Sequence, residues 1–392
     1  MRLGLYIDGA FRSSADGRVF CGDELFGFMR FASAVGERFD RFLLIARGTA
    51  DEPATPYPLP EKVELAKLPH YESLRQLGAV AAALPRTVGA MWRALDQLDA
   101  VWVSGVHPFG LVLASLAAMR RRRVVLLIRQ DSPRYFRARL PCPLWAPLLL
   151  PLRVLDGVFR VLGRRARTTV VGPEIACRYR APRRNLLEMR VTALDRSQLV
   201  AGPSAADWSG PISLLTVGRV EPEKNPELVV AALAELDRTD PGRYSLTWVG
   251  GGDLAGPLAE AASARGVGDR LRLIGFVPFG PELLRLYRGA HAFVHVSVTE
   301  GVPGVLYEAM GSGLPIVATD VGGVSAALAG GEAGLVVPPS DAEAVANAIR
   351  HLKADAALRE RLAGRALELA AAATIESESD RVARFIASAQ TP

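Results

Sequence analysis

Short apolar runs alternate with amphipathic stretches along the C-terminal half of the chain. The runs are continuously apolar, which is typical of parallel strands that are covered on both faces. The stretches between them repeat apolar residues at helical spacing. We therefore predict strands at residues 212–219, 245–253, 270–278, 292–298, 315–320 and 334–339, and helices at residues 226–236, 254–265, 281–288, 303–310 and 341–352.

The N-terminal half repeats this pattern less regularly. It predicts strands at residues 2–8, 41–47, 100–105, 124–129 and 168–172, and helices that include residues 23–35 and 110–119. Small residues with glycine and proline at 200–211 are typical of a linker. We therefore predict two Rossmann-like α/β domains, residues 1–205 and 206–375, and a C-terminal helix at 376–392 that packs back on the first domain.

The composition is that of a folded protein with more than one core. The chain has 392 residues, of which 49% are hydrophobic. Its three cysteines, Cys21, Cys142 and Cys177, are widely spaced and suit a reducing cytosol. The first apolar run ends at Asp8, and prolines and charges interrupt the apolar segment at 141–163. We therefore predict a cytoplasmic protein without a signal peptide or a transmembrane helix.

Charge is divided unevenly between the halves. The net charge is +6, but the first 210 residues hold 31 basic and 19 acidic residues, and the rest hold 16 and 22. An arginine-rich proteome would explain this without any function. The alternative is a basic N-terminal half that approaches an anionic partner. We expect that partner not to be a nucleic acid.

Two glutamates eight positions apart, Glu300 and Glu308, stand in a glycine-rich stretch that otherwise has the composition of a core. Parallel sheets bind ligands outside the carboxyl ends of their strands, and Glu300 follows a predicted strand. Glu308 lies among apolar residues of the next predicted helix, which makes a merely solvated acid the poorer interpretation. We predict that Glu308 meets the ribose hydroxyls of a nucleotide and that Glu300 faces the other end of the ligand.

The start of that helix suits a phosphate group. Pro303 is favoured at the first helical position, which puts Val302 near the N-cap, where valine accepts no hydrogen bond. The amides of Gly304 and Val305 then need another acceptor, and the helix dipole favours an anion. Gly301 and Gly304 have no side chain and let a ligand approach the backbone closely.

Two cations are expected at the same sheet edge. Arg219 and Lys224 follow the strand at residues 212–219. An arginine after a strand is most often an ordinary surface residue. Its combination with a nearby lysine and a glutamate-bearing, glycine-rich helix start is much less expected by chance, and it predicts a phosphate site.

These residues resemble the retaining nucleotide-sugar glycosyltransferases of family 4, the glycosyl transferases group 1. The resemblance is strongest over residues 214–352 and weaker before them. In that family, two Rossmann-like domains with parallel sheets face each other across a cleft, the GT-B architecture. The resemblance therefore implies an α/β fold of this kind and transfer of a sugar from a nucleoside diphosphate to an acceptor hydroxyl.

The family motifs carry over residue by residue. A strand ending in Gly-Arg, here Gly218 and Arg219, is followed by Glu223 and Lys224, and the Arg and Lys are implied to hold the donor diphosphate. In the Glu-x7-Glu motif, Glu300 is implied to contact the transferred sugar and Glu308 the ribose. The segment 275–277 resembles the part that frames the base, and residues 317–323 resemble the turn after the motif helix. The implied donor site comprises Gly218, Arg219, Lys224, Gly275, Phe276, Val277, Glu300, Gly301, Gly304, Val305 and Glu308.

The N-terminal half departs from the family pattern. The usual Gly-Gly loop after the first strand is replaced by residues 9–24, and Gln130 or Asp131 stands where a second histidine is common. His107 matches a histidine at the end of a central strand, and we count it with Glu300, Arg219 and Lys224 as a candidate catalytic residue. A packing or positioning role for His107 is an equal alternative. Ser325 and Ala326 replace a glutamate that usually follows the Gly-Gly of the C-terminal half.

The resemblance implies that the leaving phosphate itself helps to deprotonate the acceptor. No acidic cluster of the DxD type lies near the donor motifs, so we expect no catalytic metal and no cofactor. A dehydrogenase is disfavoured because residues 249–257 do not fit the GxGxxG spacing. A sugar-nucleotide-binding protein without activity remains the alternative function.

The sequence leaves the sugar, the nucleotide and the acceptor open. Arg120 to Arg123 follow one apolar helix, and Arg160, Arg164, Arg165 and Arg167 accompany another apolar stretch. Apolar surface beside basic residues is typical of peripheral contact with an anionic membrane, here its inner face. The acceptor would then be a lipid or a lipid-linked glycan. A solvated arginine face, with a small-molecule acceptor, is the alternative.

Overall fold

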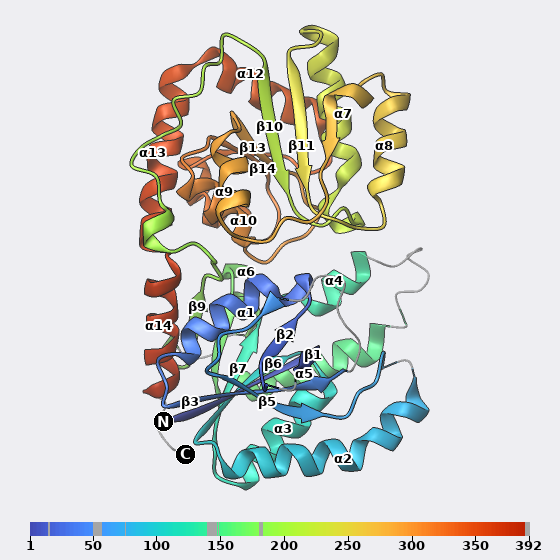
Figure 1. The fold of residues 1–392 in the computed structure, drawn as a ribbon, viewed down its shortest axis with the longest axis vertical. Helices are drawn as coiled ribbons and strands as arrows, with labels where there is room; N and C mark the ends of the chain where they lie inside the picture. Colours follow the sequence, from blue (N-terminus) through green and yellow to red (C-terminus); the bar gives the residue numbers. More distant parts are fainter. Residues whose placement is uncertain are drawn as a thin grey trace. The chain divides into compact units, whose positions relative to one another are not determined.

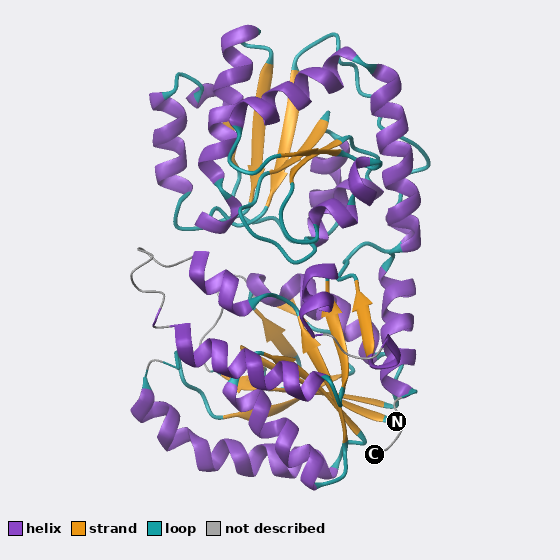
Figure 2. Cartoon of the chain, turned by 180° about the vertical axis from the view of Figure 1, so that it is seen from behind, coloured by secondary structure: helices purple, strands orange, loops and turns teal. Residues whose placement is uncertain are grey.

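The computed structural model of the protein describes residues 1–14, 16–49, 57–74, 76–138, 147, 149–179 and 183–388. The chain forms two compact units, each with helices on both sides of a sheet (Figures 1 and 2). The first unit comprises Met1–Pro133, Cys142–Val191 and Glu376–Pro392, and the second Arg134–Pro141 and Thr192–Ile375. The prediction of an α/β protein with two domains is confirmed.

The sheet of the first unit is parallel over most of its width. Its parallel strands run in the order β5-β3-β1-β6-β7-β8-β9, and a short antiparallel pair, β2 and β4, extends the end of β1. Burial of the continuously apolar central strands explains why the sequence pattern predicts them. The strands are β1 (Arg2–Ser13), β2 (Val19–Cys21), β3 (Arg41–Gly48), β4 (Tyr57–Pro58), β5 (Val63–Leu68), β6 (Ala100–Gly105), β7 (Arg123–Ile128), β8 (Arg167–Val171) and β9 (Leu186–Met189).

The helices of this unit lie between its strands in sequence. The sequence predicts α1 and α3 but not α2, α4, α5 and α6. Residues 9–24, which stand where the family has a Gly-Gly loop, form the last part of β1 and the whole of β2. These two segments pair as antiparallel strands. The helices are α1 (Asp23–Gly36), α2 (Leu77–Asp96), α3 (Pro108–Met119), α5 (Leu150–Gly163) and α6 (Pro173–Tyr179), and α4 (Ser132–Ala138) spans the division between the units.

The second unit has a sheet in which all strands are parallel, in the order β12-β11-β10-β13-β14-β15. Its strands are β10 (Ile212–Val217), β11 (Tyr244–Val249), β12 (Leu271–Leu273), β13 (Ala292–His295), β14 (Ile316–Thr319) and β15 (Leu335–Val337). Its helices are α7 (Pro226–Thr239), α8 (Ala255–Ala264), α9 (Pro281–Arg288), α10 (Gly304–Gly311), α11 (Val324–Ala327), α12 (Ala342–Ala354) and α13 (Ala356–Ala372).

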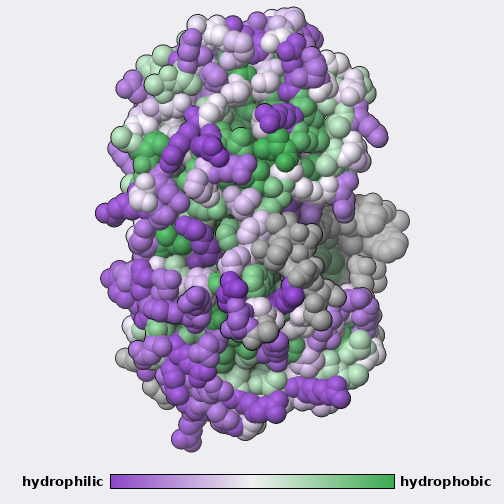
Figure 3. Space-filling view, viewed as in Figure 1, coloured by the Kyte–Doolittle hydropathy of each residue, from purple (hydrophilic) through white to green (hydrophobic). Residues whose placement is uncertain are grey.

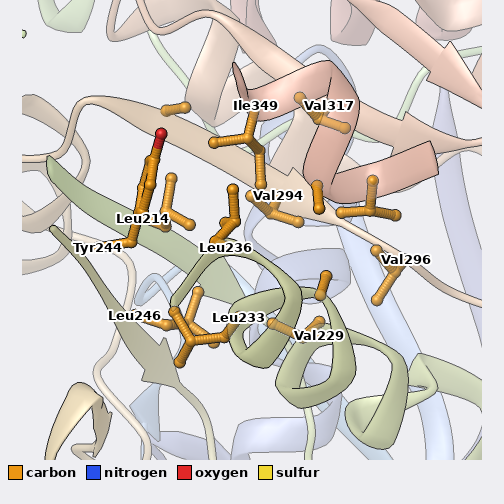
Figure 4. Packing of buried hydrophobic residues seen from close by; sticks show 14 of the residues in the cluster. Leu214, Val229, Leu233, Leu236, Tyr244, Leu246, Val294, Val296, Val317 and Ile349 are labelled. Atoms are coloured by element: carbon orange, nitrogen blue, oxygen red, sulfur yellow. The ribbon is translucent and has the colours of Figure 1, made fainter. Parts of the chain in front are cut away.

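One face of this sheet packs against α7 and α12. Figure 4 shows Leu214 and Leu246 from the strands meeting Leu233 and Leu236 of α7, with Ile349 of α12 beside them. These side chains are all at most 3% exposed. The apolar spacing of α7 in the sequence thus corresponds to the face that covers the sheet.

The division between the units differs from the predicted boundary. Residues 192–205 belong to the second unit, so the chain divides after Val191 rather than after residue 205. The amide of Val200 donates to the carbonyl of Gly311, and that of Ser204 donates to the carbonyl of Gly313. Small and proline residues in this stretch therefore form an ordered strap on α10 rather than a free linker.

The last helix, α14 (Ile375–Ala387), lies along the first unit (Figure 1). Its Glu378 is 2% exposed and accepts hydrogen bonds from the backbone and the guanidinium of Arg190, and from Arg381 of the same helix. Arg167, at the start of β8, donates to the carbonyl of Phe385 at 2.7 Å. A buried carboxylate with several charged donors therefore anchors the end of the chain.

No described helix is long and apolar enough to span a bilayer. Hydrophilic side chains gather over much of the first unit in the view of Figure 3.

We predict that Glu378→Gln destabilises the protein by about 3 kcal/mol, because it removes the charge that two arginines share in a buried place. The change should lower the midpoint of urea unfolding. Asp380→Asn is the matched control, since Asp380 of the same helix pairs with Arg384 at the surface and should contribute less than about 1 kcal/mol. Equal losses in the two variants would contradict the anchoring role of Glu378.

Candidate functional site

The candidate donor site forms at the carboxyl ends of β10 and β13. These strands are neighbours in the sheet, with Leu214 opposite Ala292. Residues that are 76 positions apart in the sequence therefore meet at one edge. Lys224, which ends the 3-10 turn after β10, forms an ion pair with Glu300, which follows β13.

Glu300 lies in an enclosed polar environment. Its side chain is 10% exposed, and its Oε1 accepts a hydrogen bond from Ser297 Oγ at 2.6 Å. The same oxygen lies 3.1 Å from His295 Nε2. Burial raises the pKa of Glu300, but the Lys224 ammonium and the His295 imidazole outweigh burial and hold it well below the usual range. Glu300 is therefore a carboxylate at neutral pH and accepts hydrogen bonds rather than donating a proton.

Two acids hold the predicted cation Arg219 in place. Its guanidinium lies 2.8 Å from Glu221 and 2.9 Å from Glu223. Glu223 is 3% exposed, whereas the Arg219 side chain is 40% exposed. The two residues of the Glu-Lys motif thus have different partners. Glu223 pairs with Arg219 and orients it, whereas Lys224 pairs with Glu300.

The paired glycines after β14 support the loop that carries Glu300. Gly322 has a φ of +57°, and a Cβ there would lie 2.0 Å from the carbonyl oxygen of Glu300. The amide of Gly323 donates to the carbonyl of Gly301 at 2.7 Å. Only glycine allows this close approach, so the Gly-Gly after the motif helix holds the loop after β13.

The same device operates beside β10. A Cβ at Gly250 would lie 2.0 Å from the carbonyl oxygen of Gly218, and the Gly250 amide donates to the carbonyl of Gly275. Gly250 therefore connects Gly218, which is predicted to lie near the phosphate, with Gly275 of the segment that is predicted to frame the base. Phe276 is 37% exposed beside this junction, and Val277 is partly buried.

Helix α10 begins one residue later than predicted. Pro303 is the N-cap rather than the first helical residue, and no side chain caps the helix. Gly304 and Val305 occupy its first turn and are both only partly buried. Their amides therefore stand at the helix N-terminus, where an anion is favoured. The expectation that Val302 holds the N-cap position is wrong, but the uncapped start is observed.

Glu308 has a partner that the sequence does not reveal. The hydroxyl of Tyr287, on α9, donates to Glu308 Oε2 at 2.9 Å. Tyr287 is fully buried, and burial with the nearby Glu308 charge raises its pKa far above the usual range, so it stays protonated. Tyr287 thus orients the carboxylate that is predicted to meet ribose. A tyrosine in a short amphipathic helix gives no sequence signal of this role.

His107 belongs to the first unit and is not part of this cluster. It is the N-cap residue of α3, its Nδ1 lies 2.9 Å from the hydroxyl of Tyr6, and its Nε2 lies 3.2 Å from Asp8. Burial lowers the pKa of His107, against the pull of Asp8. Asp8 also accepts a hydrogen bond from Tyr71 and pairs with Arg47.

His107 therefore lies in a polar network between the middle of β1 and the carboxyl ends of β3 and β6, whose other members sequence reasoning missed. The loop after β7, where Gln130 or Asp131 replaces the histidine common in the family, has a structural role, because Asp131 forms an ion pair with Arg178. Arg129, directly after β7, stacks on the ring of Phe28 at 4.2 Å.

Among the described residues, no group of three or more side chains has the arrangement of a metal site.

The C-terminal region matches a known family. Residues 206–368 match the model of the glycosyl transferases group 1. This region is similar to a glycosyltransferase group 1 domain. It contains every predicted donor-site residue described above.

The matched relatives carry several activities. A D-inositol 3-phosphate glycosyltransferase of Frankia alni is 39% identical over 168 residues, which cover 40% of this chain and 40% of the relative. A glycogen synthase of Mycobacterium tuberculosis is 35% identical over 170 residues, which cover 41% of each chain. The similarity thus spans about two fifths of the curated relatives.

Solved structures extend the likeness to the whole chain. Sucrose-phosphate synthase from Thermosynechococcus elongatus superposes with a TM-score of 0.73 at 20% identity, covering 100% of both chains. Anabaena HepE in complex with UDP-glucose gives a TM-score of 0.70 at 18% identity, covering 99% of this chain and 100% of HepE. At such identities the likeness shows the fold, which is the GT-B fold.

We predict that Lys224→Met lowers the urea midpoint at neutral pH and flattens the acid limb of the stability profile. A carboxylate with a depressed pKa contributes stability above its usual range and loses that contribution as the pH falls through the folded-state value. Without Lys224, only His295 opposes burial, so the folded-state pKa of Glu300 rises, its contribution at neutral pH shrinks, and the difference between parent and variant narrows as the pH falls. Urea midpoints between about pH 3 and pH 7 measure this difference. Lys353→Met, which removes a more exposed pair with Asp240, is the control, and an identical profile in both variants would refute the coupling.

Proposed function

We propose that this protein is a retaining glycosyltransferase that moves a sugar from a nucleoside diphosphate to an acceptor hydroxyl. The observation that carries the proposal is the meeting of Lys224 and Glu300, beside Arg219, at one edge of a group 1 domain. One edge thus offers cations for a diphosphate and a carboxylate for sugar hydroxyls. HepE, which shares the fold, is solved with UDP and with UDP-glucose, and a uridine nucleotide is the donor to test first.

In the proposed reaction, the diphosphate lies between the guanidinium of Arg219, the ammonium of Lys224 and the amides at the start of α10. As the bond to the sugar breaks, negative charge grows on the leaving phosphate, and these groups stabilise it without rearranging. The Glu221 and Glu223 carboxylates hold Arg219 in one position beforehand. Because these groups are fixed in advance, they lower the free-energy barrier to sugar transfer.

Glu300 and Glu308 bind different parts of the donor. Glu300 accepts hydrogen bonds from hydroxyls of the transferred sugar, and its pKa, held low by Lys224, keeps it from acting as a proton donor. Glu308, oriented by Tyr287, accepts from the ribose. The proton of the acceptor passes to the leaving phosphate, as the family resemblance implies. The first unit would bind the acceptor, with His107 positioned by Tyr6 and Asp8.

We predict that Arg219→Ala and Lys224→Ala each lower turnover at least ~100-fold, since each removes a group that stabilises the leaving diphosphate. Release of UDP from UDP-sugars, with and without acceptor mixtures, measures this rate. Arg238→Ala is the matched control, because Arg238 makes only a surface pair on α7. Turnover within ~3-fold of the parent in both site variants would discard the assigned site. A folded parent that binds UDP and releases none from any donor would favour a sugar-nucleotide-binding protein.

Metal independence follows from the same proposal, since side-chain cations and helix amides replace the divalent ion at the diphosphate. We predict that turnover in excess EDTA stays within ~2-fold of the untreated rate. The measurement is UDP release after dialysis against chelator, with and without added Mg²⁺ or Mn²⁺. Loss of activity that either ion restores would contradict a role for Arg219 and Lys224 as the main diphosphate ligands.

A further inference from the structure

Helix α5 presents apolar side chains outwards. Leu150, Val154 and Val161 are 61%, 60% and 58% exposed, whereas most large hydrophobic residues of the described chain are buried. They are four and seven positions apart, so at 100° per residue they lie on one face of the helix. Three large aliphatic side chains therefore share one outward stripe.

The opposite face of α5 is the one that packs on the first unit. Phe159 is fully buried in the core of that unit, and Gly163 packs beside Tyr179. Asp156, the only acid of the helix, is 3% exposed and pairs with Arg160 and Arg178. The outward stripe is thus a second apolar face, and it is not needed for anchoring the helix.

Basic residues line one side of this stripe. Arg153, Arg160 and Arg164 are spaced by seven and four positions, which places them in a row along the edge of the stripe. Arg153 and Arg164 are exposed, as is the following Arg165. Because Asp156 is buried, the outer side of α5 presents aliphatic and cationic groups and no acid.

We propose that the outer face of α5, defined by Leu150, Val154 and Val161 with Arg153 and Arg164, docks on an anionic membrane. Helices that lie in the membrane interface combine an apolar stripe with flanking basic residues in this way. The aliphatic side chains enter the acyl boundary, and the arginines meet lipid phosphates. A partner protein is less suited, because the stripe carries none of the aromatic residues that anchor protein interfaces.

Of the two arginine groups considered from the sequence, this face includes members of the second and none of the first. Arg120 pairs with Asp96 and stacks on Trp92, and Arg123 donates to the carbonyl of Ala387. Those arginines have partners within the chain. The docking surface does not depend on the donor site, so it holds or fails separately from the proposed reaction.

Co-sedimentation of the full chain with vesicles tests the proposal. We expect binding to vesicles of phosphatidylglycerol and phosphatidylcholine, and none to pure phosphatidylcholine vesicles. Val154→Glu and Val161→Glu should each weaken binding at least ~10-fold, since each puts a charge into the stripe. The double change Arg153→Gln with Arg164→Gln should weaken it ~30-fold and remove most of the salt dependence.

The matched control is Met119→Glu. Met119 is 72% exposed at the end of α3, next to the other arginine run, and this variant should bind vesicles like the parent. Circular dichroism and the urea midpoint of each variant show that it is folded, independently of the membrane and of the donor site.

Three outcomes would overturn the proposal. The first is no binding of the parent to anionic vesicles at low salt. The second is loss of binding in Met119→Glu with no loss in the α5 variants. The third is a parent dimer that Val154→Glu converts to monomers while vesicle binding is unchanged, which would assign the stripe to self-association.

Discussion

The ion pair between Lys224 and Glu300 depends on the pairing of β10 with β13, and the candidate site depends on this ion pair. The two residues come from different β-α loops, and only neighbouring parallel strands bring their loops together. Burial alone would drive Glu300 towards its neutral form. Lys224 and His295 reverse this, so a buried carboxylate remains charged where a sugar would have to be held.

Glycine makes the loops around this pair possible. Gly250 and Gly322 each pass within contact distance of a carbonyl oxygen on the neighbouring loop, where a side chain would collide. The backbone is thereby packed loop against loop, and Gly275 is tied into the same arrangement. The backbone amides of the site need such fixed loops, because mobile amides would have to be ordered each time a phosphate binds.

Sequence reasoning reached all parallel strands of the second unit and the central ones of the first, but not β5 and β9 at the two edges. It also reached the strand-end positions of Arg219, Lys224 and Glu300, because continuous apolar runs and motif spacing are local signals. It did not reach Tyr287 or His295, whose roles depend on contacts between separate elements. It also placed the boundary too late. Residues 192–205 have linker composition, but their amides bond to the end of α10, and composition does not record such pairings.

The two units use arginine in different ways. In the second unit, acids on both sides hold Arg219, so its charge is oriented rather than free. In the first unit, the acid of α5 is buried and satisfied from within, which leaves Arg153 and Arg164 beside an aliphatic stripe. An excess of basic residues alone does not distinguish a solvated face from a docking face. The position of the acids does, because a carboxylate on the outer side of α5 would be repelled by an anionic surface and would neutralise its arginines.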